Sequence, residues 1–151
     1  MAWTNSKIFS AFITDALNNT AALDLNADTF KVALFDNSIT PSQTVATASS
    51  LYGAGVWAGG GVGDTPSWPA VGRDLASVAS GFSSNVYTFD AADTVSADAT
   101  TDLAAVFGCL VYDDTVADQG ICYNYFGGSN SVTNGTFTVV WNASGILALT
   151  L

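Results

Sequence analysis

The second half of the chain is a series of short segments with apolar residues at alternate or consecutive positions, each closed by turn-forming residues. Alternation with a period of two is typical of a β-strand with one buried face. A first segment of this kind lies earlier, at residues 29–35, where Phe30, Val32 and Leu34 share a face. Further strands are expected at residues 85–90, 104–112, 121–126, 136–141 and 146–151. The spacing predicts a mainly β fold, with an antiparallel β-sandwich or barrel-like body.

Turn-forming residues set the expected connections between these strands. Asp113-Asp114-Thr115 turns the chain back after residues 104–112. Gly127-Gly128 is expected to open a polar loop that lasts until Gly135. Asn142-Ala143-Ser144-Gly145 has the length of a hairpin connection and should join the last two strands. Residues 85–151 are therefore predicted to form a β meander.

The start of the chain has helical rather than strand periodicity. A single amphipathic helix is predicted over about residues 6–18, with Thr4, Asn5 or Ser6 as its cap. We expect the apolar stripe to pack on the sheet of the same chain, although docking on a partner would use the same residues. The stripe consists of Ile8, Phe9, Phe12, Ile13, Ala16 and Leu17.

Residues 41–84 contain all three prolines and eight of the 14 glycines, and they interrupt the strand pattern. We interpret them as a long Gly/Pro-rich excursion from one domain that spans residues 1–151. Tyr52, Trp57 and Trp68 lie in this excursion, and Trp3 lies in the N-terminal segment. They are the candidate partner-contact residues, because Trp and Tyr dominate binding hot spots. The competing interpretation is that the excursion folds back and its aromatic rings cap the sheet. Replacing Trp57 and Trp68 by Ala distinguishes these two interpretations, because thermal stability would fall strongly only if the two rings cap the sheet.

The charged residues exclude several classes of partner. All 13 acidic residues are Asp, and only Lys7, Lys31 and Arg73 oppose them, which gives a net charge of −10. Binding to nucleic acid or to an anionic membrane surface needs clustered cations, so neither is expected. No apolar run reaches the about 18 residues of a membrane helix. The N-terminal residues also lack the pattern of a secretory signal.

The chain contains no His, which removes the common catalytic triads and His-containing zinc sites. Residues 53–58 fit G-x-G-x-x-A, but four further glycines between residues 59 and 63 replace the helix that binds a dinucleotide. The Asp residues lack the spacing of a calcium-binding loop. We therefore expect no enzyme activity, no catalytic residue, no metal site and no cofactor. A small Asp-dependent hydrolase stays open as an alternative, with no particular Asp singled out.

Two cysteines, Cys109 and Cys122, lie on either side of the predicted turn at residues 113–115. We interpret them as reduced, buried, small apolar residues, because free Cys is among the most buried residue types. A cross-strand disulfide between them is also conceivable. The separation of their Cα atoms decides between the two.

Several strand and turn motifs, taken in order, resemble a family of small structural proteins of tailed bacteriophages, the capsid decoration or minor capsid proteins. They cover most of the chain, and residues 42–84 match least. The motifs are Phe30-Lys31-Val32-Ala33-Leu34-Phe35 with Asn37-Ser38 and Thr40-Pro41, Tyr87-Thr88-Phe89-Asp90-Ala91-Ala92-Asp93, Leu110-Val111-Tyr112-Asp113-Asp114-Thr115, Tyr125-Phe126-Gly127-Gly128, Gly135-Thr136-Phe137-Thr138, Trp141-Asn142 and Gly145-Ile146.

This resemblance implies a β-rich, non-catalytic protein that binds the outer surface of an assembled capsid and reinforces contacts between shell subunits. Its expected partners are the major capsid protein and further copies of itself, commonly as a homotrimer. The expected location is the virion, after assembly in the bacterial cytoplasm. The alternative is a tail or adhesion component that recognises a cell-surface glycan through Tyr52, Trp57 and Trp68.

Overall fold

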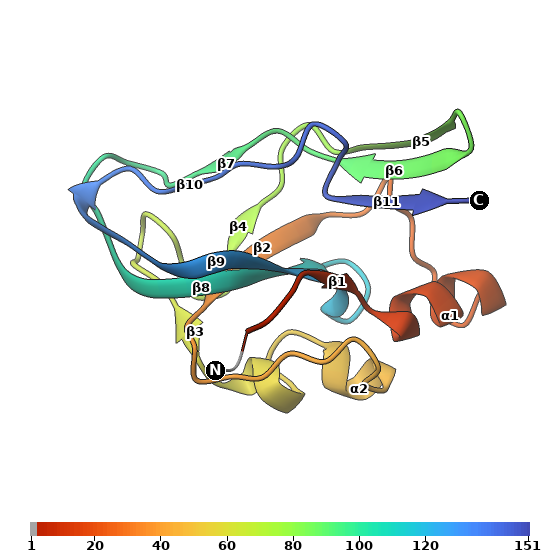
Figure 1. Cartoon of the computed structure of the whole chain (residues 1–151), viewed down its shortest axis with the longest axis horizontal. Helices are drawn as coiled ribbons and strands as arrows, with labels where there is room; N and C mark the ends of the chain where they lie inside the picture. Colours follow the sequence, from red (N-terminus) through yellow and green to blue (C-terminus); the bar gives the residue numbers. More distant parts are fainter. Residues whose placement is uncertain (1–2) are drawn as a thin grey trace.

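The computed structural model describes residues 3–151, which fold mainly into antiparallel strands (Figure 1). Strands hold 42% of the residues and helices 11%, which confirms the expectation of a mainly β fold. In chain order the elements are β1 (Lys7–Ile8), α1 (Ser10–Asn18), β2 (Phe30–Phe35), α2 (Thr47–Ser50), the 3-10 helix η1 (Gly55–Ala58), β3 (Gly61–Val62), β4 (Arg73–Asp74), β5 (Ala79–Ser83), β6 (Val86–Asp90), β7 (Thr94–Val95), β8 (Thr101–Asp113), β9 (Gln119–Gly135), β10 (Thr138–Val139) and β11 (Leu147–Thr150).

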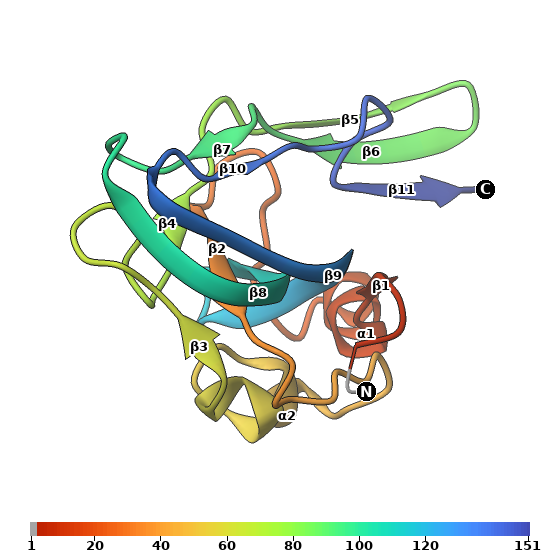
Figure 2. The same ribbon diagram turned by 60° about the vertical axis from the view of Figure 1, so that its left-hand side comes forward.

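The strands form one large sheet and two small ones. The large sheet has the order β1-β9-β8-β2-β3, and β4 pairs with the same edge of β2 as β3. Its end strands do not pair with each other within residues 3–151, so it does not close into a barrel. The small sheets have the orders β11-β6-β5 and β10-β7. They lie over one side of the large sheet, whereas α2 lies on the other side (Figures 1 and 2).

Strand β2 is buried on both faces, although its sequence alternates as if only one face were covered. Phe30 packs against Phe89 of β6, with ring centroids 5.0 Å apart. Phe35, which points to the opposite face, lies 5.0 Å from the ring of Trp57 in η1. Ala33, which lies between these two residues in the strand, is also buried. Small sheets on one side and the 47–58 segment on the other therefore make β2 a core strand.

Strands β8 and β9 form a long hairpin, and this corrects the predicted polar loop after Gly127. Strand β9 continues to Gly135, which pairs with Thr101 at the far end of β8. Four register shifts interrupt the pairing, and Ala105 adopts a positive φ of 54° at one of them. The distal part of β9 is exposed, so its polar residues suit an outlying strand as well as a loop.

The expected hairpin between residues 136–141 and 146–151 does not form, and neither does a continuous meander over 85–151. Strand β10 pairs with β7, and β11 pairs with β6. The predicted turn is present, because Gly145 has a φ of 97° and its N–H donates to the carbonyl of Asn142 over 2.8 Å. The next residue, Ile146, donates its N–H to the carbonyl of Phe89, which carries the chain onto β6.

The N-terminal helix is shorter than predicted. Lys7 and Ile8 pair with β9, and the N–H of Phe9 donates to the carbonyl of Ile121. The helix therefore starts at Ser10 without a side-chain cap, so the expectation of a cap at residues 4–6 was wrong. It ends where the sequence indicated, with Asn19 in the left-handed conformation.

Residues 41–84 form an ordered cover of short elements rather than one extended loop. Helices α2 and η1 lie under the large sheet, and β3 and β4 pair with β2. Strand β5, at the end of the segment, pairs with β6. The segment supplies Trp57 and Trp68 to the same hydrophobic cluster as β2 and β8.

Candidate interaction surface

The structure places Trp3 and Trp57 together inside the core. Their side chains are 0% and 2% exposed, and their rings meet edge to face at 5.9 Å. The indole N–H of Trp3 donates to the carbonyl of Asp36 over 2.7 Å. A Cβ atom on Gly108 would come within 2.6 Å of the Trp3 ring, so the glycine in β8 leaves room for this ring. Close edge-to-face packing of this kind stabilises aromatic clusters beyond the area they bury.

The other two candidate contact residues also face the protein itself. Trp68 is 0% exposed and meets Phe137 edge to face at 5.7 Å. Tyr52 is half-buried and stacks on Tyr112 at 4.8 Å. The hydroxyl of Tyr112 in turn donates to the carbonyl of Val71 over 2.6 Å. The contacts of Tyr52 and Val71 with Tyr112 anchor the 41–84 segment to β8 of the large sheet.

This placement corrects the expectation that Trp3, Trp57 and Trp68 are exposed contact residues. Large aromatic side chains are costly to leave in water, so the glycine-rich segment folds back and buries them. Of the two interpretations that the sequence left open, the structure favours the one in which the rings cap the sheet. Tyr52 keeps part of its surface exposed.

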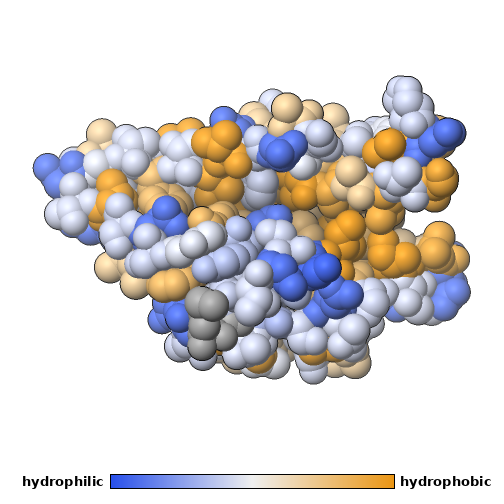
Figure 3. Space-filling view, viewed as in Figure 1, coloured by the Kyte–Doolittle hydropathy of each residue, from blue (hydrophilic) through white to orange (hydrophobic). Residues whose placement is uncertain are grey.

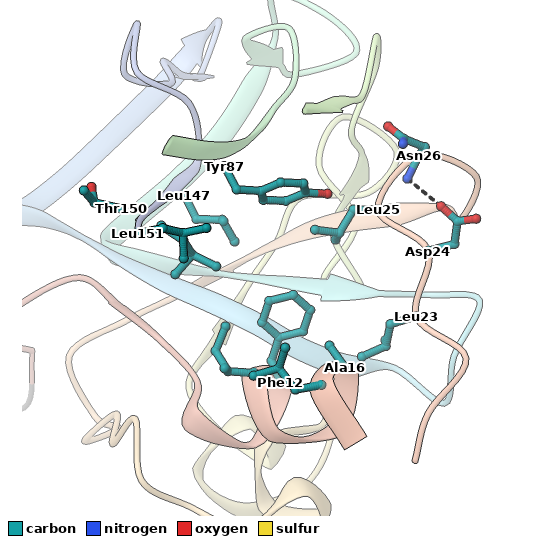
Figure 4. A pocket seen from close by; sticks show the side chains of 13 residues that line it. Phe12, Ala16, Leu23, Asp24, Leu25, Asn26, Tyr87, Leu147, Thr150 and Leu151 are labelled. Carbon is teal, nitrogen blue, oxygen red and sulfur yellow. Dashed lines mark hydrogen bonds between the residues drawn. The ribbon is translucent and has the colours of Figure 1, made fainter. Parts of the chain in front are cut away.

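An open apolar cleft lies instead between α1 and the sheet of β6 and β11. Its volume is about 570 Å³, within the range of ligand-binding pockets. Figure 3 shows hydrophobic residues gathered there, between the C-terminal strand and the N-terminal helix. In Figure 4, Leu147 and Tyr87 line the strand side of the cleft, and Phe12 lies across from them on the helix. The cleft therefore exposes the kind of surface that a folded protein usually buries.

Two leucines at this cleft are almost fully exposed. Leu17 at the end of α1 is 81% exposed, and Leu151 after β11 is 85% exposed. Single exposed apolar residues are ordinary, but contiguous apolar patches mark interaction sites. The sequence carried a partial signal for this site, since Leu17 belongs to the predicted stripe of the helix and residues 146–151 are uncharged. What it did not show is that the two segments meet.

Asp24 is the one charged residue among the described residues that line the cleft. Its Oδ1 accepts a hydrogen bond from the N–H of Asn26 at 2.9 Å (Figure 4) and another from the N–H of Ala27 at 3.2 Å. Its own N–H donates to Oδ2 of Asp28 over 2.7 Å. These bonds hold the turn after Leu23 and leave a negative charge beside apolar surface.

Strand β11 has one unpaired edge next to the cleft. The N–H of Leu151 donates to the carbonyl of Asn85, so in this register the backbone groups of Leu147, Leu149 and Leu151 face β6. The backbone groups of Ala148 and Thr150 therefore point away from β6. No other strand within residues 3–151 pairs there. Proteins commonly protect such edges with charges, proline or bulges, and this edge carries none of the three.

Asp113 and Asp28 form a pair of carboxyl groups at the start of the turn between β8 and β9. Asp113 is fully buried, and its Oδ1 accepts hydrogen bonds from the N–H groups of Thr115 and Val116. Its Oδ2 has no donor among the described residues, and the carboxyl of Asp28 lies against it. Burial, together with this second carboxyl, raises the pKa of Asp113 to about 6. The sequence did not single out this pair, in which Asp113 is buried and Asp28 is half-buried.

Two other aspartates hold segments together in their charged form. Asp15 of α1 accepts hydrogen bonds from the hydroxyl of Thr47 at 2.7 Å and from the side-chain amide of Gln119 at 2.9 Å. Asp98 accepts one from the hydroxyl of Ser67 at 2.7 Å. These donors lower the pKa of both carboxyl groups, because they stabilise the anion.

The two cysteines are free and buried, as the sequence indicated. In the β8–β9 ladder Cys109 lies opposite Asn124 and Cys122 opposite Val111, so the cysteines are diagonal neighbours. Diagonal positions are about 7–8 Å apart, which exceeds the reach of a disulfide. Burial raises the pKa of both thiols, that of Cys122 to about 12.

We expect both thiols to resist modification in the native protein, because the thiolate is the reactive form. A thiol-specific chromogenic reagent should label neither cysteine of native protein within minutes and both after unfolding in guanidinium chloride. A Cys109→Ser variant, which leaves one thiol, identifies which residue reacts. Rapid labelling of Cys122 in the native protein would contradict this prediction.

No group of three or more metal-ligating side chains occurs among residues 3–151. No helix in the same residues has the length and apolar character needed to cross a bilayer. No protein-family model matches the chain, and neither a curated protein nor a solved structure matches it significantly.

Proposed function

We propose that this chain is a non-catalytic structural protein that binds the outer surface of a tailed-bacteriophage capsid and reinforces contacts between shell subunits. The observation that carries the proposal is the apolar cleft beside the uncharged edge of β11, in a chain that otherwise carries a net charge of −10. Such a surface fits a partner protein, and not a nucleic acid or an anionic membrane. The phage-like motifs supply the class of partner, namely the major capsid protein.

The positions of these motifs in the structure are consistent with the proposal. The motif at residues 30–35 is the core strand β2, and the motif at residues 87–93 begins in β6, beside the cleft. The motif at residues 110–115 ends β8 and includes Asp113. The motifs therefore define the body that carries the interaction surface. We infer that this body is a β-sandwich, because the Phe30–Phe89 contact joins the large sheet to the β11-β6-β5 sheet across the core.

We also propose that several copies assemble on the capsid, as homotrimers, after synthesis in the bacterial cytoplasm. Repeated copies on a lattice add their contacts by multivalency, so a weak single contact suffices. The alternative of a glycan-binding tail protein loses its proposed sugar platforms, since Trp57 and Trp68 are 2% and 0% exposed. Tyr52 alone keeps an accessible edge.

The copy number of the chain in purified virions tests this function. Quantitative mass spectrometry against the major shell subunit should give about one copy per subunit, or a simple fraction such as about one third, because decoration follows the lattice symmetry. A handful of copies per particle would place the protein in the tail or neck. Absence from the particle would overturn the structural function.

A further inference from the structure

We propose that an extended segment of the shell subunit pairs with the free edge of β11 and places apolar side chains over the cleft, with a Lys or Arg beside Asp24. This inference rests on the proposed function and specifies the contact through which it acts. It assigns the docking site to Ala148 and Thr150 for the backbone, Leu17 and Leu151 for the apolar contact, and Asp24 for the charge.

The backbone of β11 determines that the docking segment is extended. Ala148 and Thr150 each present an N–H and a carbonyl away from β6, in the spacing of a strand. An added strand satisfies these groups, as in other cases of β-augmentation. A helix or a small apolar molecule would cover the cleft but leave the edge groups without backbone partners.

The cleft determines which side chains the segment carries. Side chains alternate along β11, so those of Ala148 and Thr150 lie on the face away from α1. Directly opposite residues in neighbouring strands share a face, so residues of the added strand opposite Ala148 and Thr150 also point away from α1. Their neighbours in the added strand share the face of Leu149, which lines the cleft with α1. These neighbours would meet Leu17 and Leu151, and apolar side chains there remove both leucines from water.

Charge determines which partner is favoured over a second copy of this chain. Residues 146–151 carry no charged side chain, and Asp24 has the one charged side chain among the described residues at the cleft. A second copy would bring another ten net negative charges to a chain whose own net charge is already −10. A segment with a Lys or Arg near Asp24 instead gains a favourable contact, so the site selects a basic, apolar strand.

The test is binding of the purified protein to virions that lack it, prepared from the phage that encodes the chain. Leu17→Ser removes an exposed apolar contact, and Thr150→Pro removes an outward N–H while the bonds of Leu149 and Leu151 to β6 remain. Asp24→Asn removes the charge and keeps the Oδ1 acceptor of the turn. Each of the first two variants should weaken binding at least about ten-fold, and Asp24→Asn should weaken it less and reduce its salt dependence.

Matched controls use equivalent positions outside the cleft. Val71→Ser removes an exposed aliphatic side chain, and Ser83→Lys alters the opposite edge of the same small sheet at β5. Both should bind virions as the unmodified protein does. Because Leu17 is largely exposed, Leu17→Ser should keep its melting temperature and remain informative even where Thr150→Pro does not fold.

Hydrogen exchange on the bound protein gives a second readout. The amides of Ala148 and Thr150 should gain protection on the virion, while the outward-facing amide of Phe82 in β5 should not. Failure of the unmodified protein to bind virions would overturn the proposed function. Unchanged binding by the Leu17→Ser and Thr150→Pro variants would overturn the docking site and leave the function in place. Conversion of an oligomer to monomers by both variants, with virion binding intact, would assign the edge to a second copy and also overturn the inference.

Discussion

Replacing Trp57 by Ala should lower the free energy of unfolding by about 3–5 kcal/mol, the loss typical of deleting a buried aromatic side chain. The ring is 2% exposed and lies between Trp3, Phe9 and Phe35, at centroid distances of 5.9, 6.0 and 5.0 Å. Its loss leaves a cavity that rigid neighbouring rings fill poorly. For a chain of this size the melting temperature should fall by about 10 °C or more, measured by calorimetry or circular dichroism.

Val56→Ala is the matched control, because Val56 precedes Trp57 in η1 and its side chain is exposed. Its melting temperature should change by no more than about 2 °C, since exposed substitutions usually cost under about 0.5 kcal/mol. Trp57→Phe should lie between the two, because it retains part of the ring packing. If the Trp57→Ala protein melts at the same temperature as the unmodified protein, Trp57 is not a core residue, and its role as a surface contact residue would be supported.

Replacing Asp113 by Asn should stabilise the protein at pH 7.5 by about 2–3 kcal/mol. The folded state raises the pKa of Asp113 from 3.8 to about 6, so it favours the protonated carboxyl. The stabilising contribution of this proton is complete below pH 3.8 and is lost as the pH rises through 6. Asn keeps the Oδ1 acceptor for Thr115 and Val116 and provides an N–H toward Asp28 at every pH.

Urea unfolding at pH 4 and pH 7.5 measures this effect. The gain of Asp113→Asn over the unmodified protein should be present at pH 7.5 and disappear at pH 4. Asp15 and Asp98, whose pKa values are lowered, give the opposite pH dependence, but they act equally in both proteins and cancel in the difference. Asp114→Asn is the control, because it removes a surface ion pair with Lys31 and should not stabilise at either pH. An equal gain at both pH values would contradict the buried-carboxyl explanation.

Much of the β structure could be predicted from the sequence, because alternation and turn residues are local signals. Strands β2, β6 and β8 fall where period-two or continuous apolar segments predicted them. The buried, free state of Cys109 and Cys122 also followed from residue type. The turn before Ile146 was predicted in place, although the pairing beyond it was wrong.

Pairing and burial depend on residues that are distant in sequence, and here the predictions were less accurate. Whether the strand after Gly145 returns to β10 or crosses to β6 depends on which edge is free. The aromatic residues of the 41–84 segment had two reasonable positions, and only the fold shows that Trp57 and Trp68 are core residues. The cleft could not be predicted for the same reason, since Leu17 and Leu151 come from opposite ends of the described chain.

The position of β2 in the sheet has a consequence for synthesis on the ribosome. This strand ends at Phe35, but its long neighbour β8 is complete only at Asp113, close to 80 residues later. At about 5–20 residues per second, the Phe-Lys-Val-Ala-Leu-Phe segment waits roughly 4–16 seconds for that partner. A strand of this composition with one edge unpaired readily pairs with other chains. We therefore expect the yield of soluble protein to depend on how well the host's chaperones shield this one segment during translation.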